Sequence, residues 1–289
     1  MDATAAELFE ILTLEKLEQN LFRGTGAGGE TSMRIFGGQV IAQALSAAYE
    51  TVPENRSCHS LHAYFIRPGD PEKPVIYEVD RARDGGSFTT RRVVAIQSGQ
   101  QILNLSSSFQ KPEQGWTYQH EMPDVPPPED LVSNIDYLAE FVDDMPDPFR
   151  QRILRARPFE QREVTPRHPW NPKIESDVNY VWFRVPAAAG QDQRKQQVLL
   201  SYLSDLNLLG SSMRPHKLTY YQQKTMSASL DHAFWIHGEI DLSEWNLYSM
   251  DAPFTGGARG FNRGAIFSRD GRLVASVAQE GLMRPIGQD

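Results

Sequence analysis

Three polar side chains in the C-terminal half of the chain lie within largely apolar segments. Asp205 interrupts the run LLSYLSDLNLL, Ser229 opens SLDHAFW, and Gln279 lies within LVASVAQEG. A carboxylate that loses part of its water shell becomes a better proton acceptor near neutral pH. A hydroxyl and an amide can hold a water by further hydrogen bonds. Together these side chains could activate a water for hydrolysis.

Each of these side chains also has a structural alternative. Asp205 could point out of its helix, or cap local backbone together with Ser204. Gln279 could lock the fold, because a buried amide is costly unless its hydrogen bonds are made. Strand side chains alternate, so we expect Ser229 and Asp231 on one face and His232, packed and hydrogen-bonded, on the other.

Two predicted helices must position these residues. The first, Gly37 to Val52, reads GGQVIAQALSAAYETV and carries small apolar residues at helical spacing. The second, Gln196 to Leu209, is apolar nearly all round and carries Asp205. Short β-branched runs separated by Asp-Gly and Ser-Gly turns follow each helix. This order predicts an α+β fold in which an antiparallel sheet wraps each helix.

The two halves resemble each other in sequence. CHSLHAYFIRP near residue 60 is repeated as SASLDHAFWIH near residue 230, and two glycine turns follow each copy. The paired anchors, at offsets of 169, 171 and 172 residues, are Ser60 with Ser229, Gly85 with Gly256, and Gly99 with Gly271. A duplication predicts an N-terminal unit at 1–111, a Pro-rich, partly helical connector at 112–170 and a C-terminal unit at 171–289. The first helix has Gln43 or Ala44 where the second has Asp205, so the C-terminal unit is expected to carry the catalytic residues.

Composition excludes several classes of function. A net charge of −8 argues against binding to a nucleic-acid backbone. No apolar run reaches the roughly 18 residues of a membrane span, and the N-terminus lacks the basic region of a secretion signal. Cys58 is the only cysteine, so we expect a reducing, cytoplasmic setting. Metal-ligand, Walker, dinucleotide and Gly-x-Ser-x-Gly motifs are absent, so neither metal nor cofactor is expected.

Seven motifs, in order, resemble the acyl-coenzyme A thioesterase II family. They are FGGQVIAQAL, SLHAYFIRPGDP, DGGSFTTRRV, SDLNLL, SLDHAFWIH, ARGF and LVASVAQEGLMR, and the resemblance extends from about Thr13 to Arg284. It implies a double hotdog fold: two tandem units, each with an antiparallel sheet around a long central helix. It also implies hydrolysis of acyl-CoA to free fatty acid and CoA without a covalent intermediate, in a homo-oligomer (dimer or tetramer).

The resemblance further assigns residues to the site. The family's catalytic trio is matched by Asp205, Ser229 and Gln279, with Ser where several relatives have Thr. For substrate binding we expect an oxyanion amide near Gly37 and Gly38, and support from His62. Cationic groups for the CoA phosphates are expected among Arg67, Arg91, Arg92, Arg259 and Arg263.

Two alternatives remain open at the level of sequence. A hotdog enoyl-CoA hydratase would need an Asp and a His about four residues apart on one segment, and none is evident. A non-catalytic acyl-CoA or fatty-acyl binding protein would keep its pocket apolar, whereas this chain places three polar side chains in apolar surroundings.

Overall fold

The computed structural model describes residues 3–26, 34–145, 150, 157–222 and 224–287 of the chain. These residues form two compact units. Unit 1 comprises residues 1–118, 190–206 and 230–240, and unit 2 comprises residues 119–189, 207–229 and 241–289, less those outside the described ranges. The predicted division at 111 and 170 stays a prediction, and residues 146–149 and 151–156 of the predicted connector lie outside the described part of the chain.

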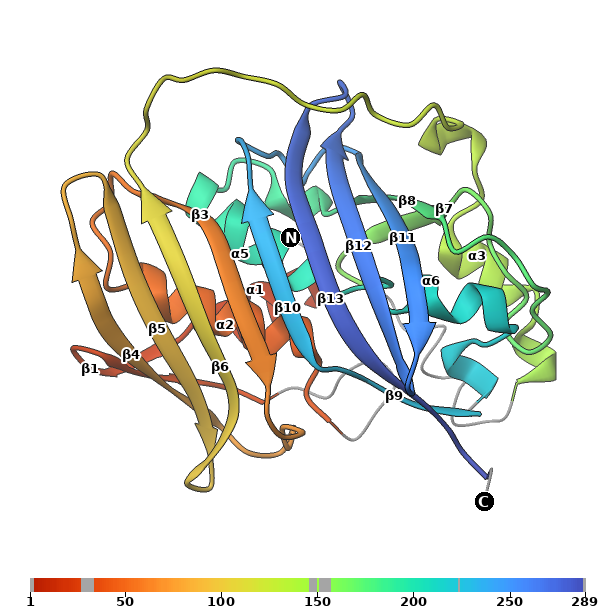
Figure 1. Ribbon diagram of the computed structural model, residues 1–289, viewed down its shortest axis with the longest axis horizontal. Coiled ribbons are helices and arrows are strands. Elements are labelled where there is room, and N and C mark those ends of the chain that lie inside the picture. The colour runs from red at the N-terminus through yellow and green to blue at the C-terminus, as the bar shows by residue number, and fades with distance from the viewer. Residues whose placement is uncertain (1–2, 27–33, 146–149, 151–156, 223, 288–289) are drawn as a thin grey trace. The chain divides into compact units, whose positions relative to one another are not determined.

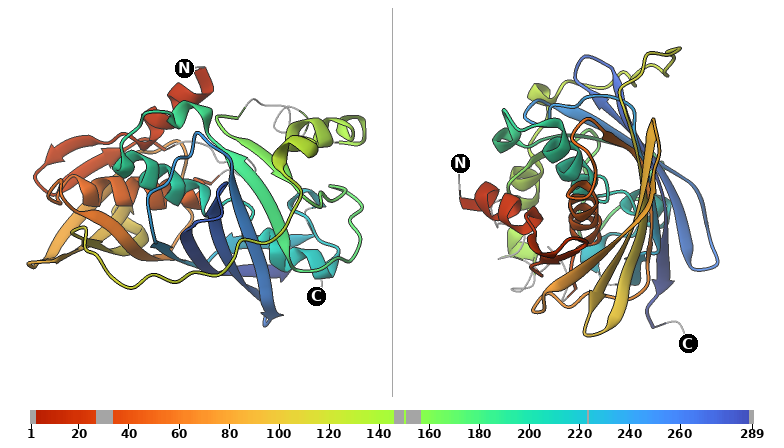
Figure 2. Two further views of the ribbon diagram at one scale, coloured as in Figure 1. Left: turned by 90° about the horizontal axis from the view of Figure 1, so that it is seen from above. Right: turned by 90° about the vertical axis from the view of Figure 1, so that its left-hand side faces the viewer.

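Unit 1 is an antiparallel sheet packed against helices (Figures 1 and 2). Its helices are α1 (Ala3–Leu12), α2 (Gly37–Tyr49) and α5 (Gln193–Leu203). Its strands are β1 (Glu15–Glu18), β2 (Leu21–Gly24), β3 (Ser57–Phe65), β4 (Val75–Asp84), β5 (Phe88–Gln97), β6 (Gln100–Gln110) and β10 (Asp231–Ile236). The strand order is β1-β2-β4-β5-β6-β3-β10, and α2 lies along the inner face of the sheet.

Unit 2 is a second antiparallel sheet with shorter helices. The strands are β7 (Glu160–Glu163), β8 (Asn179–Arg184), β9 (Thr225–Ser229), β11 (Asn246–Gly256), β12 (Arg259–Ser268) and β13 (Leu273–Pro285). The helices are α3 (Asn134–Ala139) and α6 (Gly210–Met213), and the 3₁₀ turns are η1 (Pro128–Asp130), η2 (Val142–Asp144), η3 (Pro186–Ala188), η4 (Arg214–His216) and η5 (Tyr220–Gln222). The order is β13-β12-β11-β8-β7, with β9 also paired to β13.

The duplication predicted from sequence is visible in the turns. Within unit 1, Gly85 turns β4 into β5 and Gly99, at φ 74°, turns β5 into β6. Within unit 2, Gly257 and Gly271, at φ 56° and 87°, occupy the turns β11–β12 and β12–β13. The anchor Gly256 ends β11 immediately before Gly257, so the glycine anchors mark the same two hairpins of a three-stranded meander in each unit.

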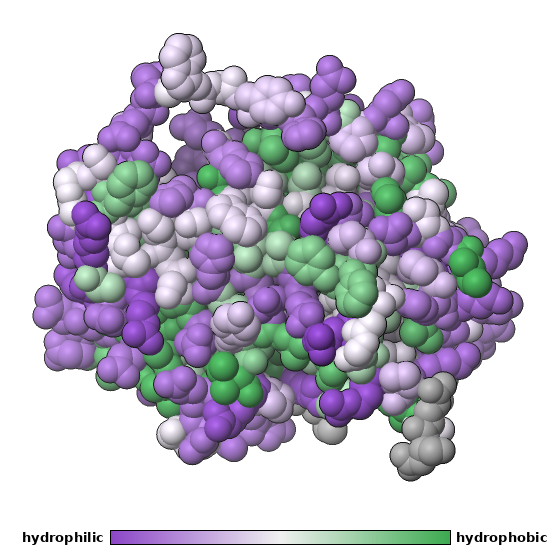
Figure 3. Space-filling model, in the orientation of Figure 1, coloured by the Kyte–Doolittle hydropathy of each residue, from purple (hydrophilic) through white to green (hydrophobic). Residues whose placement is uncertain are grey.

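The strands alternate as half-buried antiparallel sheets should. In β5, Thr89, Arg91, Val93 and Ala95 are buried, and the residues between them are more exposed. Figure 3 shows polar and apolar side chains intermixed on the visible face. Among the described residues, no helix is long and apolar enough to span a bilayer.

Helix α2 fits its place because its residues are small and apolar. Ala42, Ala44 and Leu45 are fully buried. Gln43 is also fully buried and accepts a 2.6 Å hydrogen bond from the Tyr77 hydroxyl, while its amide donates to Ile11 O at 2.6 Å. Gln43, one of the two residues that the sequence comparison placed opposite Asp205, therefore has a structural role.

Helices α2 and α5 of unit 1 run antiparallel. The Tyr49 hydroxyl near the end of α2 bonds Gln197 near the start of α5. At the opposite end, Phe36 and Tyr202 meet edge to face at 5.0 Å. A Cβ on Gly38 would collide with the Tyr202 carbonyl oxygen, which explains why only glycine fits there. This packing places the C-terminal end of α5 against the N-terminal end of α2.

The predicted helix over 196–209 is interrupted. Helix α5 ends at Leu203, a turn follows with Asn207 at φ 63°, and α6 begins at Gly210. Asn is one of the few non-glycine residues that adopt this left-handed conformation readily. Asp205 therefore lies in a turn beyond the end of the helix. The sequence pattern had placed it within the helix, and that prediction is wrong.

Candidate active site

Asp205 places a carboxylate at the N-terminus of α2. It lies two residues after the end of α5, and only 9 % of its surface is exposed. An ideal Cβ on Gly37 would lie 2.7 Å from Asp205 Oδ2, so the carboxylate rests against the first turn of α2. The first-turn N–H groups and the positive end of the helix dipole stabilise a negative charge there. The absence of a side chain at Gly37 is what makes this approach possible.

His232 holds the turn that carries Asp205. Its Nε2 lies 2.9 Å from Ser204 Oγ, and both residues are at most 1 % exposed. The Ser204 hydroxyl donates its one hydrogen to Ser201 O at 2.9 Å, so His232 Nε2 is the donor to Ser204. His232 is thus the packed, hydrogen-bonded strand residue predicted from the sequence. Its partner Ser204 was considered there only as a possible backbone cap.

Ser229 and Gln279 are joined by a hydrogen bond in unit 2. Gln279 Nε2 donates to Ser229 Oγ at 2.6 Å, and Gln279 is 1 % exposed. Since the hydroxyl accepts in this bond, its own hydrogen can be donated to a different group. The pairing follows from strand register, because Ser229 of β9 lies opposite Gly281, two residues after Gln279 on β13. Ser229 and Gln279 were both singled out from the sequence, and the structure shows that their side chains are in contact.

The strand expected to run through Ser229, Asp231 and His232 is interrupted. The strand breaks at Leu230, so Ser229 ends β9 and Asp231 starts β10. His232 is buried with Phe234, while Asp231 is half-buried. Within β10 Asp231 and His232 therefore alternate as expected, and the shared face expected for Ser229 and Asp231 stays a prediction.

A buried amide supports Gln279 from the neighbouring strand. Asn262 of β12 is fully buried and lies opposite Gln279 in the register. Its Oδ1 accepts from the Ser212 hydroxyl at 2.6 Å, and its Nδ2 donates to Gln279 O at 3.4 Å. Neither Asn262 nor Ser212 was singled out from the sequence, although a polar residue within the strand segment RGFNRGAIF is a usable signal.

Two of the predicted substrate-binding residues, Gly38 and His62, lie on different elements of unit 1. Gly38 lies in the first turn of α2, next to Gly37. His62 lies on the exposed side of β3, where its ring meets Trp235 edge to face at 5.2 Å. That face is opposite the side carrying the buried Leu61 and Ala63, so His62 points away from the helix side of the sheet.

Arg91 has a structural role in place of the predicted phosphate contact. It is 1 % exposed, and its guanidinium donates to Thr51 Oγ1 at 2.8 Å, to Thr51 O at 2.9 Å and to Asp84 Oδ1 at 2.6 Å. A buried guanidinium with its donors satisfied by the chain is unsuited to bind a phosphate from solvent.

The other predicted cations are surface residues. Arg259 pairs with Glu280 at 2.8 Å, and Arg263 pairs with Asp251 at 2.5 Å. Arg67 donates to Gln101 O at 3.0 Å, and Arg92 is exposed on β5. The described residues hold no group of three or more side chains suited to a metal ion.

Comparisons with known proteins agree with one another. Residues 28–110 match a family model described as "Acyl-CoA thioesterase N-terminal domain", and residues 150–282 match "Acyl-CoA thioesterase". The chain is 38 % identical over 278 residues to Acyl-CoA thioesterase 2 of Haemophilus influenzae, covering 96 % of each protein.

Solved structures give the same result at the level of fold. The structure of an acyl-CoA thioesterase II, TesB2, from Mycobacterium marinum is similar with a TM-score of 0.79 and 38 % identity, covering 97 % of this chain and 99 % of that one. A protein with a hot dog fold from Alicyclobacillus acidocaldarius has a TM-score of 0.74 at 19 % identity, covering 97 % and 98 %. Together with the two antiparallel sheets, these similarities confirm the predicted double hotdog fold.

Proposed function

Since this chain belongs to the acyl-CoA thioesterase II family and hydrolyses acyl-CoA to free fatty acid and CoA, we propose that Asp205, Ser229 and Gln279 carry out the reaction. The observation that carries the proposal is the buried Asp205 carboxylate at the N-terminus of α2. A desolvated carboxylate held in one orientation is suited to act as a general base.

In the proposed mechanism Asp205 takes a proton from a water as the water oxygen attacks the thioester carbonyl. Ser229 and Gln279 orient that water, and their mutual hydrogen bond fixes the direction of the hydroxyl. The tetrahedral intermediate then collapses, the carbon–sulfur bond breaks, and the proton on Asp205 passes to the CoA thiolate. The products are a carboxylic acid and CoA, and the carboxylate of Asp205 is regenerated.

The N-terminus of α2 can stabilise two negative charges in turn, first the Asp205 carboxylate and then the oxyanion of the substrate. As the Asp205 carboxylate is neutralised, negative charge develops on the substrate carbonyl oxygen. We propose that the first-turn N–H groups of Gly37 and Gly38 then stabilise the oxyanion. The positive end of α2 thus faces one negative charge throughout the reaction.

Two covalent alternatives conflict with the geometry. Ser204 and His232 resemble a nucleophile and its base at 2.9 Å, but Ser204 is fully buried and its hydroxyl hydrogen is bonded to Ser201 O. Cys58 is 2 % exposed, and burial raises the pKa of its thiol to about 12, so the reactive thiolate is scarce near neutral pH. A water activated without an acyl-enzyme fits these groups better.

Ser229 variants test the hydroxyl within this trio. We expect Ser229→Ala to lower kcat for octanoyl-CoA about 10- to 100-fold, because a donor positioned toward the reacting group is lost. Ser229→Thr keeps the hydroxyl, and its kcat is expected to stay within about threefold of wild type. The measurement is CoA release followed with a thiol reagent. Equal rates for the alanine and threonine variants would remove Ser229 from the mechanism.

We also propose that the protein works as a homo-oligomer in the cytoplasm. The edge strands of the sheets are surfaces through which sheets can pair, and a single unpaired cysteine fits a reducing compartment. Sedimentation equilibrium is expected to give a multiple of the 32.7 kDa chain mass, corresponding to a dimer or tetramer. A concentration-independent monomer would contradict this assignment.

A further inference from the structure

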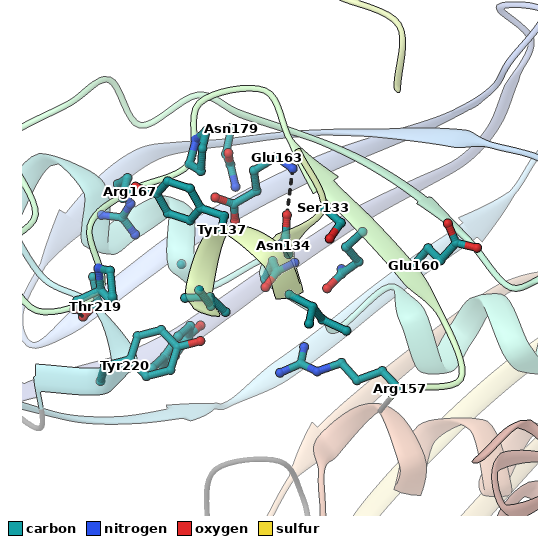
Figure 4. Close-up of a pocket in the computed structure, with 18 of the residues that line it drawn as sticks. Ser133, Asn134, Tyr137, Arg157, Glu160, Glu163, Arg167, Asn179, Thr219 and Tyr220 are labelled. Atoms are coloured by element: carbon teal, nitrogen blue, oxygen red, sulfur yellow. Dashed lines mark hydrogen bonds between the residues drawn. The ribbon is translucent and has the colours of Figure 1, made fainter. Parts of the chain in front are cut away.

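Unit 2 contains a cavity of about 340 Å³ that the hydrolytic mechanism does not use. Helix α3, strand β7, turn η5 and the segment from Asn207 to Gly210 contribute to its lining (Figure 4). Its volume falls within the range of small-molecule sites. Every residue that lines it belongs to the described part of the chain.

One wall of the cavity backs onto the strands that carry Ser229 and Gln279. Asn207 and Gly210 line the cavity, and Leu209 between them packs against the glycine at 281. Gly281 is the register partner of Ser229. Turn η5, which supplies Tyr220 to the cavity, also contacts β9. The cavity therefore lies close to Ser229 within unit 2, on the path that an acyl chain would take if its carbonyl were held at Ser229.

Two charged side chains of the cavity lining, Glu163 and Arg167, are partly desolvated. Burial raises the pKa of the Glu163 carboxyl, an effect that the nearby Arg214 and Arg167 partly offset. Burial also lowers the pKa of the Arg167 guanidinium. Figure 4 shows Glu163, Arg167 and Tyr137 on one side of the cavity. Arg167 Nη1 donates to Leu218 O at 3.1 Å, which anchors the guanidinium at the wall.

The other carboxylate of the lining is already paired. Glu160 makes a 2.9 Å ion pair with Arg184 and points away from Glu163 in Figure 4. Among the polar side chains of the lining, Glu163 is an acceptor that also receives a hydrogen bond from Asn179, and Arg167 is a donor on the same side of the cavity.

This combination discriminates among acyl groups. An unsubstituted alkyl chain in the cavity would displace water from both side chains and offer no hydrogen bond in return. A second carboxylate would attract Arg167 but repel Glu163. A hydroxyl can donate to Glu163 and accept from Arg167 at the same time, so it replaces the displaced water.

We propose that this cavity selects acyl-CoA substrates whose acyl chain carries a hydroxyl remote from the thioester. The proposal rests on the proposed function, because the acyl carbonyl is taken to be held beside Ser229. Glu163 and Arg167 are specificity-determining residues that take no part in the hydrolytic step.

The test compares ω-hydroxyacyl-CoA, unsubstituted acyl-CoA and ω-carboxyacyl-CoA at six, eight, ten and twelve carbons. We expect wild-type kcat/KM for the ω-hydroxy substrate to exceed that of its unsubstituted match about 10-fold at the best chain length, the ratio that one buried unsatisfied polar group produces. Arg167→Leu should reduce this ratio to near one. Arg269→Leu, which removes an exposed arginine paired with Glu129 in the same unit, should leave the ratio unchanged.

The outcomes are separable. Equal kcat/KM for hydroxylated and unsubstituted chains at every length, or a preference for the ω-carboxylate, would overturn the proposal, and the wild-type enzyme alone decides this even if Arg167→Leu fails to fold. A hydroxyl preference that persists in a folded Arg167→Leu variant would place the selection elsewhere. Hydrolysis of unsubstituted octanoyl-CoA tests the proposed function separately, because it does not depend on the cavity's preference.

Discussion

Replacing Asp205 by asparagine is expected to lower kcat for acyl-CoA hydrolysis at least 100-fold, with a smaller change in KM. The side chains are nearly the same size, but the amide cannot accept the proton of the attacking water. General-base catalysis is worth about 100- to 10,000-fold, so its loss corresponds to about 3 kcal/mol or more of transition-state stabilisation. The carboxylate is 9 % exposed, so solvent can compensate for its loss only in small part.

The measurement is the release of CoA from palmitoyl-, octanoyl- and acetyl-CoA with a thiol reagent. Cys58 is 2 % exposed with a pKa raised to about 12, so the folded protein should contribute little background. Asp192→Asn is a matched control, because Asp192 caps the opposite end of α5 and asparagine caps a helix equally well. A folded Asp205→Asn enzyme with kcat within threefold of wild type would exclude Asp205 as the base.

The sequence predicted the elements around the site better than their ends. The small, apolar face of GGQVIAQAL could be read as a helix packed closely in the core, and α2 spans Gly37–Tyr49. The interruption after Leu203 was not predicted, because the apolar run continues through Leu209 without glycine or proline until Gly210. Asn207 was the available signal, since asparagine tolerates the φ of 63° found there.

The residue types of the site were predictable, but their partners were not. A carboxylate, a hydroxyl and an amide stand out within largely apolar segments of the sequence. The bond from His232 to Ser204 joins residues 28 positions apart, and no local pattern encodes it. Arg91 illustrates the same limit. Alternation in β5 places it on the inner face, but Thr51, 40 residues away, is what makes its burial tolerable.

The exposed position of His62 could have been predicted. Within SLHAYF, Leu61 and Ala63 lie on one face of the strand, and His62 and Tyr64 lie on the other. The family resemblance suggested His62 as a site residue, while the alternation of the strand already predicted that its side chain is exposed to solvent. Where a family motif and the alternation of a strand disagree about the direction of a side chain, the alternation is the more direct physical constraint.

Gly37→Ala is expected to lower kcat about 10- to 100-fold while the protein remains folded, because misplacing a catalytic group by about 1 Å can cost 100-fold. The new Cβ would lie 2.7 Å from Asp205 Oδ2 and 2.9 Å from the Phe65 ring, so the carboxylate must move away from the first turn of α2. Alanine is favoured over glycine in a helix by roughly 0.5–1 kcal/mol, which offsets part of the strain.

Alanine substitutions at two other glycines, Gly38 and Gly86, distinguish a catalytic effect of Gly37→Ala from a loss of stability. At Gly38 the added Cβ meets the Tyr202 carbonyl oxygen, which is backbone and cannot swing aside, so Gly38→Ala should lower the free energy of unfolding by about 1–3 kcal/mol. At Gly86 a Cβ meets nothing within 4 Å, and Gly86→Ala should match wild type in both activity and thermal melting. If Gly37→Ala instead kept the wild-type kcat, the contact between α2 and the Asp205 carboxylate would not matter for catalysis. A loss of activity in Gly37→Ala with an unchanged melting temperature would tie catalysis to the position of that one carboxylate.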